Sequence, residues 1–94
     1  MTPSLKNKLK YRLKEIYAEN AKLNIGKSGI TDAIVKEIDR QLNLHQVIKI
    51  KFLTNFLTED FQADIDKITK KTQSSLVDKR GKTIIIYRQK RSDV

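Results

Sequence analysis

A short polar loop early in the chain has the residue types and spacing of a phosphate-binding site. It reads Gly26-Lys27-Ser28-Gly29. Glycines allow a phosphate to approach consecutive backbone N–H groups closely, and the lysine adds a positive charge. An alternating segment at 22–25 precedes the loop and a helical pattern from Thr31 follows it, so the helix would direct its positive end at the ligand. The loop could therefore hold a nucleotide for chemistry or a nucleic-acid backbone for binding.

The nucleotide interpretation requires features that the chain lacks. A Walker A loop has a glycine five residues before its glycine-lysine pair, but Ala21 occupies that position here. No strand ending in aspartate follows, because the apolar run at 47–53 ends in Thr54 and Asn55. A chain of 94 residues is also short for such a fold. Nucleotide hydrolysis is therefore disfavoured, while a plain strand-to-helix turn and a nucleic-acid clamp both remain open.

KH domains use a short glycine loop to clamp a nucleic-acid backbone. In those domains the loop joins two helices, whereas the alternation at 22–25 predicts a strand before this loop. Asp32 also stands where KH domains prefer an apolar residue. The mechanism of a backbone clamp fits this chain, but the KH fold does not.

Hydrophobic spacing predicts the elements that must position this loop. Helices are expected at about 2–17, 31–43 and 57–68, and strands at 22–25, 47–52, 75–78 and 83–87, with a turn at 79–82. Thr2, Thr31 and either Asn55 or Thr58 are the expected N-caps, and Pro3 suits a first helical turn. The last strand is apolar on both faces, so it is expected in the middle of the sheet. The order αβαβαββ predicts an α/β fold with three helices and a mixed sheet of about four strands.

Charge is distributed unevenly along the chain, whose formal net charge is +9. Bases without any acid occupy 6–14 and 79–91, whereas most acids lie between them, at 32–66. Such a charge on a small domain favours a polyanionic partner: RNA, DNA or an anionic membrane. The apolar stripe of the first helix is needed for the core, which disfavours membrane binding by that helix.

Composition excludes several classes of site. The chain contains no cysteine, so disulfides and thiolate metal sites are impossible. No apolar run approaches the length needed to span a bilayer, and the first residues lack the apolar stretch of a secretory signal. We expect a single domain over 1–94, with a core of about 5–88 and a polar tail at 89–94, acting as a cytoplasmic monomer.

Four stretches taken together resemble the CRM domain family, whose single-domain members are the YhbY-like proteins. They are the basic first helix, IGKSGIT between strand and helix, VIKIKF, and GKTIIIYRQK near the end. The resemblance covers about Leu5 to Arg91. It implies a fold similar to the C-terminal domain of translation initiation factor three, and an RNA-binding module. Family members are associated with precursors of the large ribosomal subunit and, in plant organelles, with intron splicing.

The resemblance and the charge pattern together predict the RNA-binding residues. The resemblance implies that the family's RNA-facing loop falls on the glycine loop and its basic helix on 6–14. Its final element falls on Gly81, Lys82, Tyr87 and Arg88. The expected contacts are Gly26, Lys27, Ser28, Gly29, Lys6, Lys10, Tyr11, Lys14, Lys22, Arg80, Gly81, Lys82 and Arg88. No catalytic residue, metal ligand, cofactor or small-molecule substrate is expected.

Several other residues permit more than one interpretation. Tyr11 lies opposite the apolar stripe of its helix, where it could stack on a base or cover neighbouring lysines. Tyr87 follows three isoleucines and is expected mainly to pack. His45 is the single histidine, and a turn position suits it better than catalysis or metal binding. Lys36 and Arg40 could extend the basic surface or pair with the acids beside them.

The sequence therefore predicts a protein that binds structured RNA, with ribosomal RNA during large-subunit assembly as the expected target and ribosome precursors as its location. Binding would depend on phosphate contacts and shape rather than on base readout. The alternative is a chromatin protein of related α/β architecture that binds double-stranded DNA. An enzyme is disfavoured, because the single histidine has no evident catalytic partner.

Overall fold

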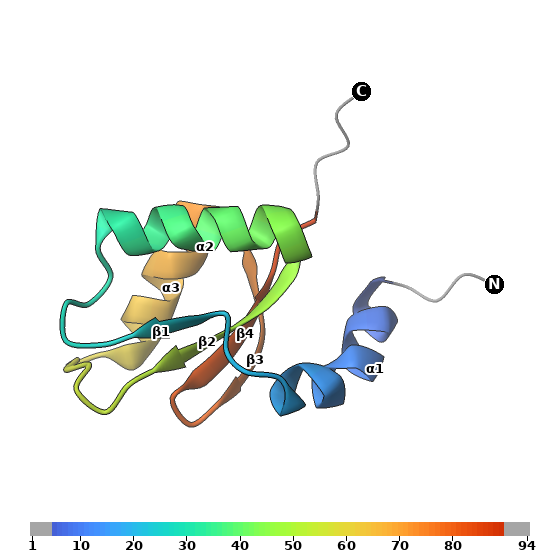
Figure 1. Ribbon diagram of the computed structural model, residues 1–94, viewed down its shortest axis with the longest axis horizontal. Helices are drawn as coiled ribbons and strands as arrows, with labels where there is room; N and C mark the ends of the chain where they lie inside the picture. The colour runs from blue at the N-terminus through green and yellow to red at the C-terminus, as the bar shows by residue number, and fades with distance from the viewer. Residues whose placement is uncertain (1–4, 90–94) are drawn as a thin grey trace.

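The computed structural model describes residues 5–89, with side chains from Arg12 onward (Figure 1). Its elements follow the predicted order: α1 (Leu5–Ala18), β1 (Leu23–Ile25), α2 (Asp32–His45), β2 (Val47–Phe52), α3 (Phe61–Thr72), β3 (Ser75–Arg80) and β4 (Thr83–Tyr87). Thr2 and Pro3, predicted to start the first helix, lie outside the described residues. So do the side chains of Lys6, Lys10 and Tyr11, although these residues belong to α1.

The strands form one mixed sheet in the order β1-β2-β4-β3. β1 runs parallel to β2, and β4 runs antiparallel to both β2 and β3. This confirms the predicted four-stranded mixed sheet and the inner position of β4. Ile84, Ile85 and Ile86 are all fully buried there, because both faces of β4 are covered.

Helices cover the two faces of the sheet unequally (Figure 1). α2 and α3 pack on one face through a large core of Ile25, Ile38, Leu42, Ile48, Ile50, Phe52, Phe56, Ile65, Ile68, Ile84 and Ile86. On the other face α1 contributes a small cluster of Ile16 with Val47 and Ile85, against which Leu13 and Tyr17 pack. α1 therefore covers only part of its face and leaves the rest of that sheet surface open.

α2 begins where the sequence predicts, because Thr31 caps it. The Thr31 Oγ1 accepts a hydrogen bond from the Ile34 N–H at 3.1 Å. The helix ends at His45 rather than near Asn43, so His45 belongs to its last turn. The chain then turns sharply at Gln46, whose φ of 64° is unusual for a residue with a side chain, and enters β2.

The start of α3 differs from the prediction. The helix begins at Phe61, and Asp60 is its N-cap, since the Asp60 side chain accepts from the Ala63 N–H at 3.0 Å. Neither Asn55 nor Thr58 caps the helix, and Leu57 lies before it with 88% of its surface exposed. The spacing of Leu57 and Phe61 suggested an earlier turn of helix, but the aspartate cap at Asp60 fixes the start.

The final hairpin is longer than predicted. β3 continues to Arg80 instead of ending at Asp78, and the turn consists of Gly81 and Lys82. Gly81 has a φ of +55°, a conformation that glycine adopts without steric cost. The extension places Arg80 opposite Thr83 within the sheet rather than in a flexible turn.

Candidate nucleic-acid interface

Three connections meet at one end of the sheet. The Leu53 N–H donates to the Ile25 carbonyl at 2.8 Å, and the Phe52 N–H donates to the Lys82 carbonyl at 2.8 Å. These bonds hold the loop at 26–29, the β2–α3 connection and the β3–β4 turn side by side. Because neighbouring strands lie about 4.8 Å apart, the end of β1 and the start of β4 are separated by about 10 Å. We call this the loop end of the sheet, comprising residues 26–29, 53–60 and 81–82.

The two glycines of the loop suit its geometry for different reasons. The Gly29 N–H donates to the Gly26 carbonyl at 2.9 Å and closes a tight turn. Gly29 has a φ of +74°, which other residues adopt only with strain. A Cβ at Gly26 would lie 2.9 Å from the Asn55 side-chain oxygen and 3.3 Å from Leu53. Close packing of the loop against the β2–α3 connection therefore explains the glycines without a ligand.

The tip of the loop keeps hydrogen-bond donors available. Lys27 and Ser28 are exposed, and within the described residues their backbone N–H groups form no hydrogen bond. The N-terminus of α2 attracts an anion less strongly than the sequence suggested. Thr31 already caps the helix, and Asp32 adds a negative charge in its first turn. An anion at this loop would therefore depend on the Lys27 side chain and the two free N–H groups more than on the helix end.

β2 presents two lysines on the partly open face of the sheet. Ile48, Ile50 and Phe52 point into the core beneath α2 and α3, so Lys49 and Lys51 point to the opposite face. Lys51 is exposed and lies opposite Asn24 of β1 and Thr83 of β4. Neither lysine is among the RNA contacts expected from the sequence. Their alternation with apolar residues in VIKIKF was the available signal.

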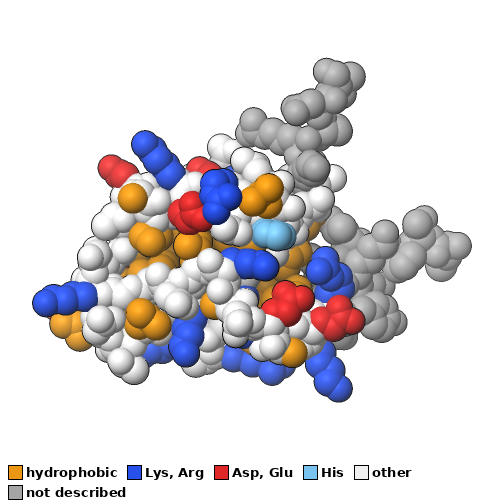
Figure 2. Space-filling model, in the orientation of Figure 1, with side chains coloured by type: hydrophobic (Ala, Val, Ile, Leu, Met, Phe, Trp, Pro, Cys, Tyr) orange, Lys and Arg blue, Asp and Glu red, His pale blue; other side chains and the backbone are white. Residues whose placement is uncertain are grey.

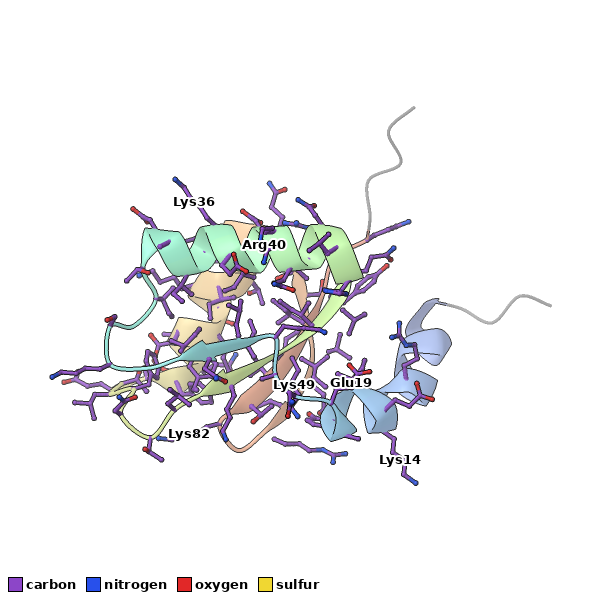
Figure 3. The ribbon with its side chains drawn as sticks, viewed as in Figure 1. Lys14, Glu19, Lys36, Arg40, Lys49 and Lys82 are labelled. Atoms are coloured by element: carbon purple, nitrogen blue, oxygen red, sulfur yellow. The ribbon has the colours of Figure 1, made fainter. Side chains whose placement is uncertain are left out.

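Lys49 fastens α1 to the sheet. Its ammonium donates to the carbonyl oxygens of Tyr17 and Glu19, each at 2.8 Å, at the C-terminal end of α1 (Figure 3). Carbonyl groups at a helix C-terminus have no partner within the helix, and a positive charge there is favourable. Lys49 is therefore committed to positioning α1, whereas Lys51 remains free to contact a ligand.

Tyr17 is the second anchor of α1. Its hydroxyl donates to Asp78 Oδ2 at 2.8 Å, and the Arg80 guanidinium lies over its ring, 4.2 Å from the ring centre. Burial, the hydrogen bond to Asp78 and the negative charge of Asp78 together raise the pKa of Tyr17 to about 12. Asp78 also faces Arg80 at 3.6 Å, so the acid on this strand is paired. Arg80 keeps 69% of its side chain exposed and extends the positive surface.

Several exposed cations lie on α1 and on the strands and turn beside it, and we call the following five the basic face. Its members are Lys14, Lys22, Lys51, Arg80 and Lys82. Lys14 and Lys82 both lie in the lower part of the view in Figure 3, with Lys49 between them. Lys and Arg side chains follow the lower margin of the molecule in Figure 2, from the loop end towards α1. The structure thus brings together several predicted contacts from distant parts of the chain.

On the opposite side of the molecule, two charged side chains of α2 pair with each other. Arg40 on α2 forms a salt bridge of 2.6 Å with Glu37 (Figure 3 labels Arg40 and Lys36 there). Hydrogen bonds from Arg40 and then Gln41 lower the pKa of Glu37 to about 2. Of the two roles that the sequence left open for Arg40, pairing is the one observed. The acids of α3 serve the helix locally: Asp60 caps it, and Asp66 accepts from Gln62 at 3.1 Å.

Arg88 has a different setting from the other predicted contacts. Its guanidinium donates to Asp39 Oδ1 at 2.6 Å, to the Thr72 carbonyl at 2.8 Å, to the Asp39 carbonyl at 2.9 Å and to Asn43 Oδ1 at 3.0 Å. It therefore ties the end of β4 to α2 and α3, away from the loop end. With 21% of its side chain exposed, Arg88 is part of the protein's own framework, and its predicted RNA contact has no support in this arrangement.

Two negative findings concern the described part of the chain. It contains no group of three or more His, Cys, Asp or Glu side chains arranged to hold a metal ion. Between residues 5 and 89 no helix is long and apolar enough to cross a membrane. His45 is exposed at the end of α2.

Comparison with known proteins identifies relatives. A family model described as the CRS1 / YhbY (CRM) domain matches residues 1–88. A protein of Pseudomonas aeruginosa named as a probable RNA-binding protein is 33% identical over 67 residues, which are 71% of this chain but 64% of that protein. A Bacillus subtilis protein, also named as a probable RNA-binding protein, is 30% identical over 69 residues, or 73% of this chain and 71% of its own.

A solved structure shares the fold. The solution structure of a hypothetical Staphylococcus aureus protein, described as an RNA-binding candidate, superposes with a TM-score of 0.71 at 27% identity. The superposition covers 95% of this chain and 92% of that one. These matches confirm the α/β fold class and the resemblance of the chain to the CRM domain family. The chain belongs to the CRS1 / YhbY (CRM) domain family.

Proposed function

We propose that this protein binds RNA, with the basic face and the loop tip holding the phosphate backbone. One observation supports the proposal most strongly. Hydrogen bonds from the end of β2 hold both the glycine loop and the β3–β4 turn at the same end of the sheet. That arrangement places Lys27, Lys51 and Lys82 at neighbouring positions on the same end. Names of the Pseudomonas, Bacillus and Staphylococcus proteins, all of which refer to RNA binding, support RNA as the polyanion.

The contacts proposed are electrostatic and follow the shape of the surface. Lys27 and the free N–H groups beside it would hold one phosphate, and the exposed cations of the basic face would hold phosphates along the sheet. Arg80 is suited to a bidentate phosphate contact, because part of its guanidinium remains exposed above Tyr17. The chain would act as a single binding unit and as a monomer.

The finer proposal is that the target is ribosomal RNA in a precursor of the large subunit. It rests on what the CRM resemblance implies about family members. Structured ribosomal RNA offers closely spaced phosphates on a folded surface, which suits a rigid sheet face better than a flexible single strand. Association with ribosome precursors in the cytoplasm follows from this proposal.

A binding experiment with matched variants tests the function. Lys51→Ala removes an exposed cation of the basic face, and Lys36→Ala removes another exposed cation, on α2 at the far side of the molecule. We expect the wild type to bind a large-subunit RNA fragment more tightly than duplex DNA of equal length. Lys51→Ala should bind the RNA several-fold more weakly, with a salt slope lower by about one, and Lys36→Ala should bind as the wild type.

The choice of variants follows from the loop geometry. Substitutions of Gly26 or Gly29 would strain the turn or displace Asn55, so a loss of binding would not separate folding from contact. Lys27→Ala leaves the backbone intact and is the cleaner test of the loop. Equal affinity of the wild type for RNA and duplex DNA would contradict RNA preference, and stronger DNA binding would favour the chromatin alternative.

A further inference from the structure

The most exposed large hydrophobic side chain of the described residues lies at the loop end. Leu57 has 88% of its surface in water, against 62% for Leu44 and 39% for Leu76. It follows Phe56, whose ring lies 4.0 Å from the position of a Cβ on Gly29. The β2–α3 connection therefore packs against the glycine loop and presents Leu57 next to it. A hydrophobic and a basic side chain protrude together at this end, on the left of Figure 2.

Contacts of the residues on both sides hold the backbone at Leu57 in place, with its side chain exposed. On one side Phe56 is buried, lies 5.0 Å from the Phe52 ring between ring centres, and donates its N–H to the Leu53 carbonyl at 3.0 Å. On the other side the Thr58 hydroxyl donates to Asp64 and accepts from the Asp60 N–H. Because the backbone is held on both sides, little backbone conformational entropy is lost when Leu57 meets a partner.

The charges around Leu57 indicate which part of a nucleic acid would reach it. Glu59 and Asp60 stand two and three positions after Leu57 and are exposed, so a phosphate at Leu57 would be repelled. Lys27 and the free N–H groups attract the phosphate at the neighbouring loop instead. The group that suits Leu57 is therefore uncharged and apolar, such as the face of a nucleobase.

We infer that Leu57 packs against an unpaired base of the bound RNA while Lys27 holds a phosphate next to it. This rests on the proposed RNA-binding function and narrows its substrate class to RNA with a bulged or looped nucleotide. In a continuous duplex the base faces are stacked and hidden, and the grooves present polar edges and 2′-hydroxyls. A leucine gains nothing there, whereas an unstacked base offers an apolar surface to bury.

Two RNAs and four variants test this inference. The RNAs have the same number of phosphates; one is a fully paired stem, and the other is a stem with bulged nucleotides. Leu57→Ser should weaken binding to the bulged RNA about fivefold to tenfold, with an unchanged salt slope and little effect on the paired stem. Leu57→Ile, which keeps an apolar side chain, should restore most of the affinity. Leu44→Ser is the control for an exposed leucine elsewhere, and Lys27→Ala should lower the salt slope for both RNAs.

The outcomes separate this inference from the proposed function. If the wild type binds neither RNA, the proposed function is wrong. If Lys27→Ala weakens binding but Leu57→Ser binds the bulged RNA as the wild type does, RNA binding stands and the base contact is wrong. Equal weakening of both RNAs by Leu57→Ser would also overturn the preference for unpaired nucleotides. Thermal unfolding of Leu57→Ser should match the wild type, because the side chain is almost fully exposed.

Discussion

The hydroxyl of Tyr17 donates a hydrogen bond to Asp78 across 61 positions of sequence and joins α1 to β3. The same ring lies beneath Arg80, a member of the basic face. Together with Lys49, this contact fixes where the basic helix stands relative to the sheet. The position of the cations on α1 thus depends on a small cluster rather than on the main core.

Removing only this hydroxyl tests how firmly α1 is held. Tyr17→Phe keeps the ring over which Arg80 lies but leaves Asp78 without its tyrosine donor. We expect the free energy of unfolding to fall by about 1 kcal/mol, measured by chemical denaturation. An unchanged stability would contradict the role of this hydrogen bond in docking α1.

The raised pKa of Tyr17 predicts a pH dependence. Folding favours the protonated phenol, because its pKa rises from the ordinary value of 10 to about 12. Its contribution to stability is therefore complete below pH 10 and is lost as the pH rises towards 12. Tyr17→Phe lacks this contribution, so the stability difference between wild type and variant should shrink over that range. A constant difference from pH 9 to 12 would contradict the assigned shift.

At Tyr87, replacing tyrosine by phenylalanine should have the opposite effect on stability from Tyr17→Phe. Its hydroxyl is buried against the small cluster under α1 and finds no hydrogen-bond partner among the described residues. Tyr87→Phe should leave stability unchanged or raise it by about 1 kcal/mol, since an unpaired buried hydroxyl is costly. A clear loss in the same denaturation assay would mean that the hydroxyl has a partner, such as a bound water.

Arg88 should matter for folding rather than for RNA. Arg88→Lys keeps the charge but cannot reproduce hydrogen bonds to Asp39, Thr72 and Asn43 together, so stability should fall by about 2 kcal/mol. RNA affinity, measured at a temperature where the variant is folded, should match the wild type. A folded variant with several-fold weaker RNA binding would instead assign Arg88 to the interface.

The order of elements followed from the sequence because each segment has clear periodicity and the inner strand is apolar on both faces. The cap of α2 was predictable since Thr31 acts on residues next to it. The start of α3 was not predictable from the sequence, because Leu57 and Phe61 are spaced as in a helix. Leu57 lies outside the helix only because Asp60 acts as the N-cap. Local sequence patterns predict helices and strands well. They define the ends of a helix poorly where the same pattern allows two starting residues.

The interface was predicted as a set of charges, without their partners. Lys27, Lys82 and Arg80 stand at exposed positions that suit the prediction, although their contact with RNA remains untested. Arg88 was expected to contact RNA because the CRM resemblance places the family's final element on it, but its partner Asp39 lies 49 positions away and is brought near only by folding. Lys51 was not among the expected contacts, because its access to a ligand depends on a sheet face that α1 leaves open. A sequence shows which side chains are charged, whereas the opposite charges that pair with them are known only from the tertiary structure.

The central claim is tested most directly by two variants of equal net charge. One carries Lys27→Ala, Lys51→Ala and Lys82→Ala on the proposed interface; the other carries Lys36→Ala, Lys67→Ala and Lys70→Ala on exposed positions of α2 and α3. Binding of each to a large-subunit RNA fragment is measured across a salt series. The account predicts that the interface variant loses most of its affinity and that its salt slope falls by about two to three, while the control binds nearly as the wild type. Equal losses in the two variants would contradict it, because binding would then depend on net charge alone.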